Sequence, residues 1–312
     1  MSQDRFLEVD VGVGYSTDPD SRRAGSEAAS KAVKVSGDPA VAFLFTTDSY
    51  DQRAVWESVK GVIGDSKLVG VCAGGVIVGD SVLRRRVCIL TLSGAGLRVV
   101  TSLQRGLSED PRGAGRRVGE ELLSGGLRRG TVFVFPDGFA ADISKALRGL
   151  YDAMGPDFTY VGGGAGDNLN FFRTYQFNEK GVQSDALAAA VLEGVSMSTA
   201  IACGWRPRGK PLIITRAQGK TVFEIDDRPA FEVYSELLGG DPPSAVRRVR
   251  HAPPHRLPRH LGQLRDKGPM EAQPRWQHRV RHGGPRGGRR LRHDLQPRPR
   301  RPKRCPCRAE GR

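Results

Sequence analysis

The sequence has 312 residues, 38% of them hydrophobic, which is enough to bury the core of one large or two ordinary domains. Its formal net charge of +15 comes from 49 Lys and Arg against 34 Asp and Glu, and residues 245–312 hold 21 of the basic and 4 of the acidic residues. The other 28 basic and 30 acidic residues leave residues 1–244 slightly acidic, so a polyanionic partner is expected only for the tail.

The amino-terminal segment MSQDRFLEVDVG has neither the basic nor the apolar region of a signal peptide, and no apolar run approaches the roughly 18 residues that span a bilayer. Three cysteines lie singly in apolar segments, as reduced core thiols do: Cys72, Cys88 and Cys203. We therefore expect a cytoplasmic protein without a membrane partner.

Residues 18–75 have the pattern of a helix followed by a βαβ unit. Asp18 suits the N-cap of this first helix and Pro19 its first turn, and small side chains recur at Ala24, Ala28 and Ala32. Such a stripe predicts close packing on a sheet. Residues 40–45 predict a buried strand, the next helix buries Val55, Val59 and Ile63, and LVGVCAGG (68–75) predicts the returning strand.

The same order recurs about 90 residues later. TVFVFPDG (131–138) predicts a strand, residues 139–155 a helix, and FTYVGGGAGD (158–167) a returning strand. The first strands align at an offset of 90 residues and the returning strands at 92. We predict two pseudo-equivalent βαβ units, while buried βαβ units in general share this pattern.

Strand-like runs with alternating and β-branched residues lie between and after the two units. They predict an antiparallel meander beside the parallel strands. Residues 229–240 predict a helix with Phe231, Tyr234 and Leu238 on one face. The expected fold class is α/β, with mixed sheets built from the two βαβ units plus antiparallel strands, and a disordered basic C-terminal tail.

Two motifs resemble nucleotide-binding sequences without meeting their requirements. GGGAGD (162–167) follows a strand, but its glycine spacing is wrong and no helix pattern follows to receive a pyrophosphate. GWRPRGKP (204–211) has the glycine and lysine spacing of a P-loop, but a proline replaces the Ser or Thr that holds Mg²⁺. Dinucleotide binding and nucleotide hydrolysis are therefore not supported.

Catalytic and metal sites are also poorly supported. All six histidines lie beyond residue 250, so Cys72 has no histidine base in residues 1–244, and a buried structural thiol is the simpler interpretation. The pair Cys305 and Cys307 lacks metal-ligand spacing with the tail histidines. We expect no enzyme, no cofactor and no metal site, and an unrecognised enzyme using Cys72 or Asp137 remains the alternative.

Glycine-rich loops at the carboxyl ends of the predicted strands form the candidate ligand site, because ligands of open α/β sheets bind there. Glycines let backbone N–H groups approach a ligand closely. Asp167, Asn168 and Arg173 could hold the amino and carboxylate groups of a small zwitterion. The site residues expected here are Cys72, Gly74, Asp137, Gly163, Gly164, Asp167, Asn168 and Arg173. The alternative is a set of tight turns with a capping aspartate.

Several segments, in this order, resemble the FIST family, named for F-box and intracellular signal transduction proteins: VGVGYSTDPD, LVGVCAGGVI, YVGGGAGD, TYQF and GWRPRGKPLIITRAQGKTVFEIDDRPAFEVYSELLG. The resemblance covers about residues 9–240. It implies a sensory module that binds a small ligand such as an amino acid and acts through a separate signalling output protein. Trp205, in the G-W-x-P segment, joins the expected ligand site. Some members bind haem, but residues 1–244 have no histidine to ligate it.

The resemblance implies a FIST N-terminal domain over residues 1–228 and a truncated start of a FIST C-terminal domain over residues 229–244. Residues 245–312 are rich in Arg, Pro, Gly and His instead, and we expect them to be disordered and read out of frame. The alternative function is nucleic-acid binding through this tail, which would be non-specific and salt-dependent.

Overall fold

The computed structural model describes residues 9–79, 81–83, 85–140, 142–195, 197–200, 202, 210–218 and 221–237. The helix expected to continue to residue 240 is described to Leu237. Trp205 and the basic tail from residue 245 to residue 312 lie outside the described residues. The expectation of a disordered tail therefore remains a prediction.

The first half of the body is a six-stranded sheet with two helices. Its strands lie in the order β1-β6-β2-β3-β10-β11, with β2 and β3 parallel and the other neighbours antiparallel. The chain forms β1 (Asp10–Ser16), α1 (Ser21–Ser36), β2 (Val41–Thr47), α2 (Gln52–Ile63), β3 (Lys67–Ala73), β6 (Val87–Ser93), β10 (Gln176–Asn178) and β11 (Gly181–Gln183). A small hairpin, β4 (Val76–Val78) and β5 (Ser81–Leu83), interrupts this path.

The second half repeats the path of the first. Its four-stranded sheet has the order β7-β12-β8-β9, with β8 and β9 parallel and β12 antiparallel to both β7 and β8. Its elements are β7 (Arg98–Arg105), α3 (Pro111–Leu123), β8 (Gly130–Pro136), α4 (Ile143–Met154), β9 (Phe158–Gly162) and β12 (Ala186–Glu193). The mixed α/β class is therefore confirmed, and the two βαβ units are parts of larger equivalent halves.

Two expectations from the sequence need correction. Only the strand-like run that ends the described chain lies in an antiparallel meander, over residues 214–229, because β6 pairs with β1 and β2 in one sheet whereas β7 pairs with β12 in the other. The N-cap of α1 is Asp20 and not Asp18. Asp18 instead accepts a hydrogen bond from the Asp20 backbone N–H at 2.9 Å, and so closes the turn before the helix.

The offsets between the halves are visible in backbone contacts. Leu44 pairs with Gly70 in the first half, and Val134 pairs with Gly162 in the second. Val134 follows Leu44 by 90 residues and Gly162 follows Gly70 by 92, so the two pairs occupy equivalent positions in their sheets. The helix caps repeat as well, because each of the four body helices has an aspartate N-cap: Asp20, Asp51, Asp110 and Asp142. These equivalences support a duplicated unit.

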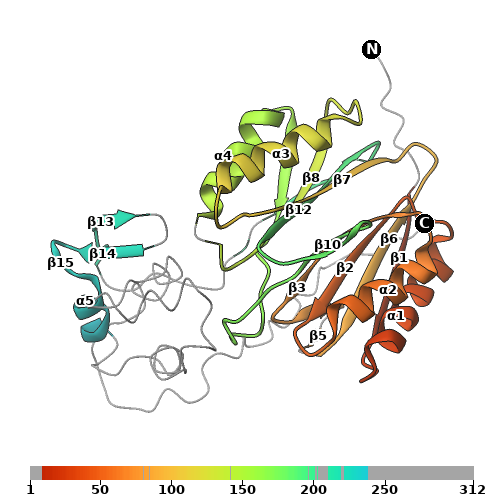
Figure 1. Cartoon of the computed structure of the whole chain (residues 1–312), viewed down its shortest axis with the longest axis horizontal. Coiled ribbons are helices and arrows are strands. Elements are labelled where there is room, and N and C mark those ends of the chain that lie inside the picture. Colours follow the sequence, from red (N-terminus) through yellow and green to blue (C-terminus); the bar gives the residue numbers. More distant parts are fainter. Residues whose placement is uncertain are drawn as a thin grey trace, which may run out of the picture.

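The body has four layers, with the two sheets packed against each other and a pair of helices covering the outer face of each (Figure 1). The alanine stripe of α1 is fully buried, as the sequence predicts. Gly12 and Gly14 allow this approach, because a Cβ at either would lie about 2 Å from a carbonyl oxygen of α1.

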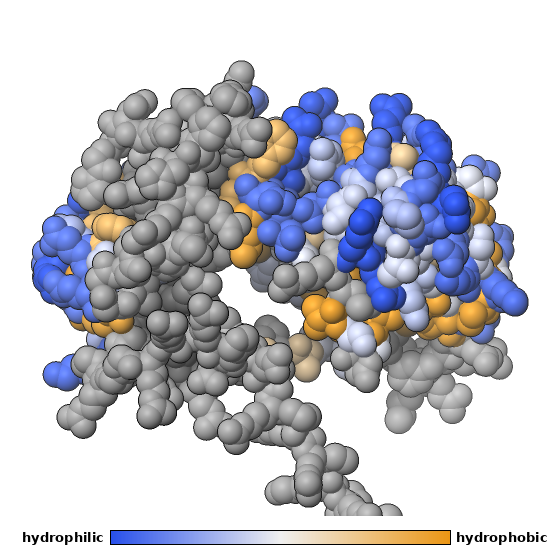
Figure 2. Space-filling model, turned by 90° about the horizontal axis from the view of Figure 1, so that it is seen from below, coloured by the Kyte–Doolittle hydropathy of each residue, from blue (hydrophilic) through white to orange (hydrophobic). Residues whose placement is uncertain are grey.

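A smaller unit follows the body and has its own apolar cluster. It comprises β13 (Ile214–Gln218), β14 (Thr221–Ile225), β15 (Arg228–Pro229) and α5 (Ala230–Leu237). Among the described residues, no helix is long and apolar enough to cross a membrane. Seen from below, the described surface is a mixture of hydrophilic side chains and small, separate apolar areas (Figure 2).

Candidate functional site

The carboxyl ends of the parallel strands of both halves come together through their glycine-rich loops. The Gly166 backbone N–H donates to the Cys72 carbonyl oxygen at 3.0 Å. A Cβ at Gly166 would lie 3.3 Å from the Gly74 nitrogen, and one at Gly74 would lie 3.5 Å from Asn168. The structure thus brings together four of the site residues expected from the sequence: Cys72, Gly74, Asp167 and Asn168.

Asp167 is buried and organises its own loop. Its carboxylate accepts hydrogen bonds from the backbone N–H groups of Phe171 at 3.0 Å, Phe172 at 2.7 Å and Arg173 at 3.2 Å. Asn168, Leu169 and Phe171 have φ values between 54° and 66°, a left-handed conformation that non-glycine residues adopt only when it is stabilised locally. The alternative of a tight turn with a capping aspartate therefore has a geometric basis at this residue.

Asp137 is also buried, and its carboxylate binds the backbone of its own turn and of the segment that precedes β12. It accepts hydrogen bonds from the N–H groups of Phe139 at 2.8 Å and Asp185 at 3.0 Å. Thr47 does the same in the first half, where its hydroxyl accepts from the Arg86 N–H at 3.3 Å. Arg86 directly precedes β6, and Asp185 directly precedes β12. The side chains of Thr47 and Asp137 therefore each hold the start of an antiparallel strand beside the site.

Asp48 is the residue of this cluster that the sequence did not single out. Asn170 donates to its Oδ2 atom at 2.6 Å, whereas its Oδ1 atom is buried and has no hydrogen-bond partner. Burial raises the pKa of Asp48, its own backbone N–H and Asn170 oppose the rise through hydrogen bonds, and the charge of Asp167 adds to it. Its only sequence signal is its place directly after a buried strand.

Cys72 is fully buried beside these carboxylates. Burial raises the pKa of its thiol to about 12. A hydrogen bond with Thr46 opposes this rise, and the charges of Asp48 and Asp167 add to it. A thiol in this state is protonated at neutral pH and is a poor nucleophile. The geometry therefore places Cys72 under the loops and away from solvent.

Arg173 and two glycines give the cluster its exposed side. Gly163 and Gly164 are exposed, and a Cβ at Gly163 would meet no atom within 4 Å. The guanidinium of Arg173 is exposed and lies 6.0 Å from the centre of the Tyr175 ring. Since it has no ion-pair partner in the described ranges, it is available to an anionic group. The rings of Phe139 and Phe171, 5.9 Å apart, join the loops of the second half.

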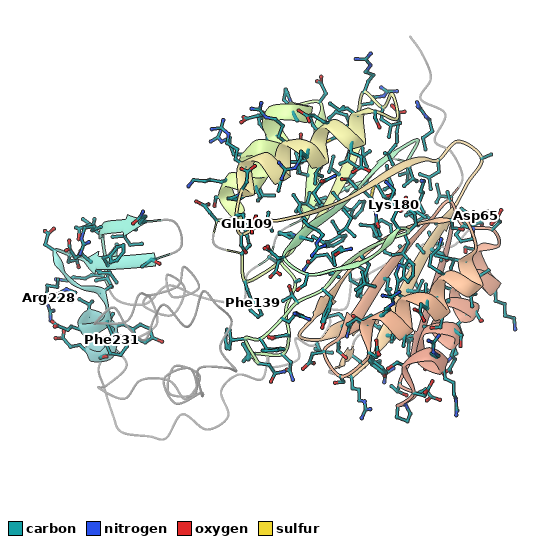
Figure 3. The ribbon with its side chains drawn as sticks, viewed as in Figure 1. Asp65, Glu109, Phe139, Lys180, Arg228 and Phe231 are labelled. Atoms are coloured by element: carbon teal, nitrogen blue, oxygen red, sulfur yellow. The ribbon has the colours of Figure 1, made fainter. Side chains whose placement is uncertain are left out.

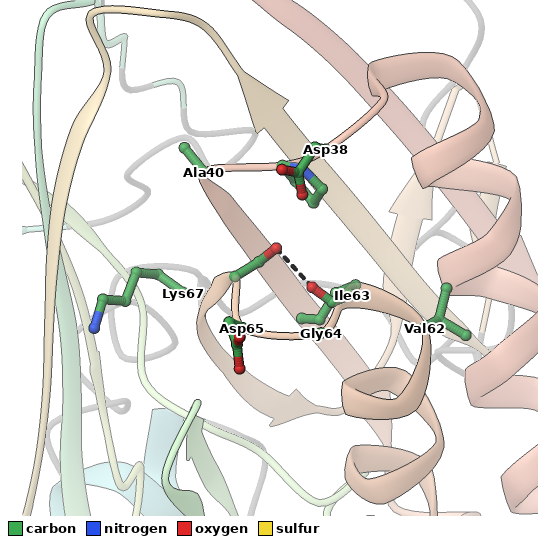
Figure 4. A pocket seen from close by; sticks show the side chains of 9 residues that line it. Asp38, Ala40, Val62, Ile63, Gly64, Asp65 and Lys67 are labelled. Atoms are coloured by element: carbon green, nitrogen blue, oxygen red, sulfur yellow. Dashed lines mark hydrogen bonds between the residues drawn. The ribbon is translucent and has the colours of Figure 1, made fainter.

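A surface depression of about 530 Å³ lies elsewhere on the molecule. It is formed by the segments that precede β2 and β3, including Asp38, Asp65 and Ser66 (Figure 4). Figure 3 shows Asp65 at one end of the body and Phe139 at the other. The Lys67 amine pairs with Glu179 at 3.2 Å, and the Ser66 hydroxyl donates to the Ile63 carbonyl at 2.7 Å. The amine of Lys67 and the hydroxyl of Ser66 therefore already have partners inside the protein.

Two equivalent halves, packed sheet to sheet with their polar loops at one end, define a duplicated four-layer α/β domain. The model of the FIST N domain matches residues 40–228 of this chain. The chain therefore belongs to the FIST family, a family of sensory domains in signal transduction.

Curated relatives share this domain at low identity. An uncharacterised protein of Mycobacterium tuberculosis is 27% identical over 242 residues, covering 75% of this chain and 61% of the relative. An uncharacterised protein of Mycobacterium bovis is 25% identical over 250 residues, which cover 77% of this chain and 62% of the relative. An uncharacterised protein of Methanocaldococcus jannaschii is 29% identical over 92 residues, which cover 28% of this chain and 18% of the relative. The chain thus spans about three fifths of the length of the mycobacterial relatives that it matches.

Proposed function

We propose that this chain is a sensory module that binds a small zwitterion, such as an amino acid, at the strand-end cluster around Asp48 and Asp167. It carries no catalytic activity, needs no cofactor, works in the cytoplasm and passes its state to a separate output protein. Membership of the FIST family and the polar groups of the cluster support this proposal.

The unpartnered Oδ1 atom of Asp48 is the observation that carries the proposal. A buried carboxylate oxygen without a donor is costly, and a second carboxylate beside it adds repulsion. A ligand ammonium would supply both the missing hydrogen bond and the missing positive charge. Asp48 is therefore better satisfied with a cationic ligand group than without one.

Arg173 supplies the complementary half of the recognition. Its backbone N–H is held by Asp167, so the residue is anchored where the loop meets the carboxylate pair. Its exposed guanidinium can bind a carboxylate through two parallel hydrogen bonds. The exposed backbone at Gly163 and Gly164 leaves room for the rest of a small ligand.

The absence of catalysis is supported by the chemistry of the site. Its thiol is buried and protonated, and residues 1–244 contain no histidine to act as its base. The buried, reduced thiols Cys72 and Cys88 fit a cytoplasmic location. A separate output protein is proposed because the residues that match the family model form a sensory domain.

A thermal-shift screen of the full chain against amino acids and small metabolites tests the proposal. A ligand at a concentration 100 times its Kd should stabilise the folded state by about 2.7 kcal/mol. Asp48→Asn should raise the melting temperature of the free protein, because it removes a buried negative charge, and should weaken the response to the ligand. Asp38→Asn, at the other end of the sheet, is the control and should leave the response unchanged. If every responding ligand stabilised the wild type and Asp48→Asn equally, the proposed site would be wrong.

A further inference from the structure

The β4–β5 hairpin of the first half is the counterpart of the β10–β11 hairpin of the second. Val76–Val78 corresponds to Gln176–Asn178 and Ser81–Leu83 corresponds to Gly181–Gln183, so both strands recur at an offset of 100 residues. The strand that follows each hairpin keeps this offset, because β6 ends at residue 93 and β12 ends at residue 193. The two hairpins are therefore equivalent parts of the duplicated fold.

The second-half hairpin closes one edge of the first sheet. β10 pairs antiparallel with β3, and Phe177 lies opposite Gly70. Phe177 is fully buried, and Val182 of β11 packs against the same apolar cluster, which the first sheet forms with its helices. The indole N–H of Trp56 in α2 donates to the Asn178 carbonyl oxygen at 2.8 Å. Helix and hairpin thus close this edge together.

The first-half hairpin closes no such edge. β4 and β5 pair with each other, and neither pairs with a third strand among the described residues. Ile77, the counterpart of Phe177, is 74% exposed, and Val82, the counterpart of Val182, is 72% exposed. Ile77 and Val82 lie directly opposite each other, so they share one face of the hairpin. The hairpin therefore presents an apolar face that the described part of the chain does not cover.

The edge of the second sheet that is equivalent to the closed one is open. β9 is the last strand of this sheet, and Gly162 is exposed there whereas its counterpart Gly70 is buried. α4 follows α2 at an offset of 91 residues, since their N-caps are residues 51 and 142 and their last residues 63 and 154. Leu147 thus takes the position of Trp56. Leu147 is 42% exposed, and Tyr151, one turn later, is 44% exposed.

The link that joins each hairpin to the preceding strand decides which chain can fill the open edge. Thirteen residues, 163–175, join β10 to β9, whereas only Gly74 and Gly75 join β4 to β3. Two residues span only about 7 Å, so the hairpin is held at the end of its own sheet. Figure 1 shows β5 at the lower end of the first sheet and α4 on the outer face of the second. The hairpin of a second copy is not limited by this link.

We propose that the β4–β5 hairpin of one copy adds to the β9 edge of a second copy, and that two such contacts close a twofold-symmetric dimer. The register follows from the β10–β3 pairing, which places Ile77 opposite Gly162 of the other copy and Val78 opposite its Val161. The apolar face of the hairpin then packs against the exposed apolar side chains of α4, and both lose their contact with water. The proposal rests on the duplicated fold and not on the zwitterion site.

Sedimentation velocity of the full chain over a range of concentrations tests the association. Ile77→Lys and Leu147→Lys each change an exposed side chain, so both variants should fold as the wild type does. Val35→Lys, at a 66% exposed position of α1, is the matched control. We expect a dimer for the wild type and Val35→Lys, and a dimer Kd at least about tenfold weaker for the other two variants. A monomeric wild type, or a dimer that Ile77→Lys leaves intact, would overturn the proposal.

Cysteine cross-linking tests the register and identifies the chain that supplies the hairpin. Opposed residues of antiparallel strands have Cα atoms about 4.5–5.5 Å apart, a separation that a disulfide bridges. A Val78→Cys chain mixed with a Val161→Cys chain should therefore give an oxidised dimer with this linkage in its peptides. A mixture of Val35→Cys and Val161→Cys chains should not. A linkage that forms only when residues 78 and 161 are both cysteine in one chain would show that the hairpin closes its own edge, and would overturn the proposal.

Discussion

Phe43 and Phe133, which are 90 positions apart in the chain, lie against each other across the interface between the two sheets, with ring centroids 4.7 Å apart. Phe45 and Phe135, again 90 positions apart, form the next edge-to-face pair at 5.9 Å. A residue can contact its own equivalent only near an axis that relates the two copies. These pairs therefore indicate an approximate twofold axis between β2 and β8.

The equivalence of the halves predicts equal sensitivity at two glycines. A Cβ at Gly70 would lie 1.9 Å from the Leu44 carbonyl oxygen, and one at Gly162 would lie 1.9 Å from that of Val134. We expect Gly70→Ala and Gly162→Ala each to lower the free energy of unfolding by about 2–4 kcal/mol. Urea denaturation measures this change. Gly163→Ala is the matched control and should cost less than about 1 kcal/mol, since open space surrounds it. A similar loss at all three positions would contradict the packing argument.

A charged contact between the sheets predicts how stability falls in acid. Glu179, in the turn between β10 and β11, accepts from the Thr101 hydroxyl of β7 at 2.5 Å and pairs with Lys67 at 3.2 Å. Burial alone raises the pKa of Glu179, but the hydrogen bonds and Lys67 outweigh it and hold the pKa below the usual 4.5. Its contribution to stability is therefore complete above about pH 4.5 and is lost as the pH falls through the lowered value.

Glu179→Gln should accordingly destabilise the protein by about 1–2 kcal/mol at pH 7, and the difference from the wild type should shrink between pH 4.5 and pH 3. Urea unfolding at a series of pH values measures the difference. Glu120→Gln, on the exposed face of α3, should show no such dependence. A difference that stayed constant down to pH 3 would show that the ionised contact contributes nothing.

Burial of Cys72 predicts slow alkylation of the native protein. Since the thiol is fully buried and its pKa is raised to about 12, iodoacetamide should modify Cys72 only when the site opens or unfolds. Mass spectrometry of peptides after timed alkylation, with and without urea, measures this. Modification of native Cys72 at the rate of the urea-unfolded chain would revive the enzyme hypothesis.

The basic tail predicts that any DNA binding belongs to residues 245–312. The full chain should bind duplex DNA weakly, with an affinity that falls steeply as salt rises, because 21 basic residues of this segment can contact phosphates. Truncation after residue 244 should abolish the binding in a mobility-shift assay. If residues 1–244 alone bound DNA at physiological salt, the sensory interpretation would need revision.

The sequence predicted the repeated βαβ units and their offsets, because buried strands and glycine-rich returns have strong local signals. It did not predict α3, since Gly113, Gly115 and Gly119 are poor helix formers. Tertiary packing explains these residues, because a Cβ at Gly115 would lie 1.9 Å from the Ala146 carbonyl oxygen of α4. The close approach of α4 therefore leaves room only for glycine at this position of α3, although glycine has a low helix propensity.

The candidate site was predicted in outline and not in detail. The sequence placed Cys72, Gly74, Asp167 and Asn168 at strand ends, and these residues do lie together. It could not distinguish an aspartate engaged by backbone amides, such as Asp167, from one with an open oxygen, such as Asp48, because that difference depends on three-dimensional hydrogen bonding. Their roles in binding, and that of Trp205, remain predictions.

A calorimetric double-mutant cycle tests the central claim most directly. It combines Asp48→Asn with removal of the amino group from the best-binding amino acid of the screen. We predict that the wild type loses about 10- to 100-fold in affinity for the des-amino ligand, whereas Asp48→Asn binds both ligands almost equally. Equal losses for the wild type and Asp48→Asn, or no binding of any amino acid to the wild type, would contradict the account.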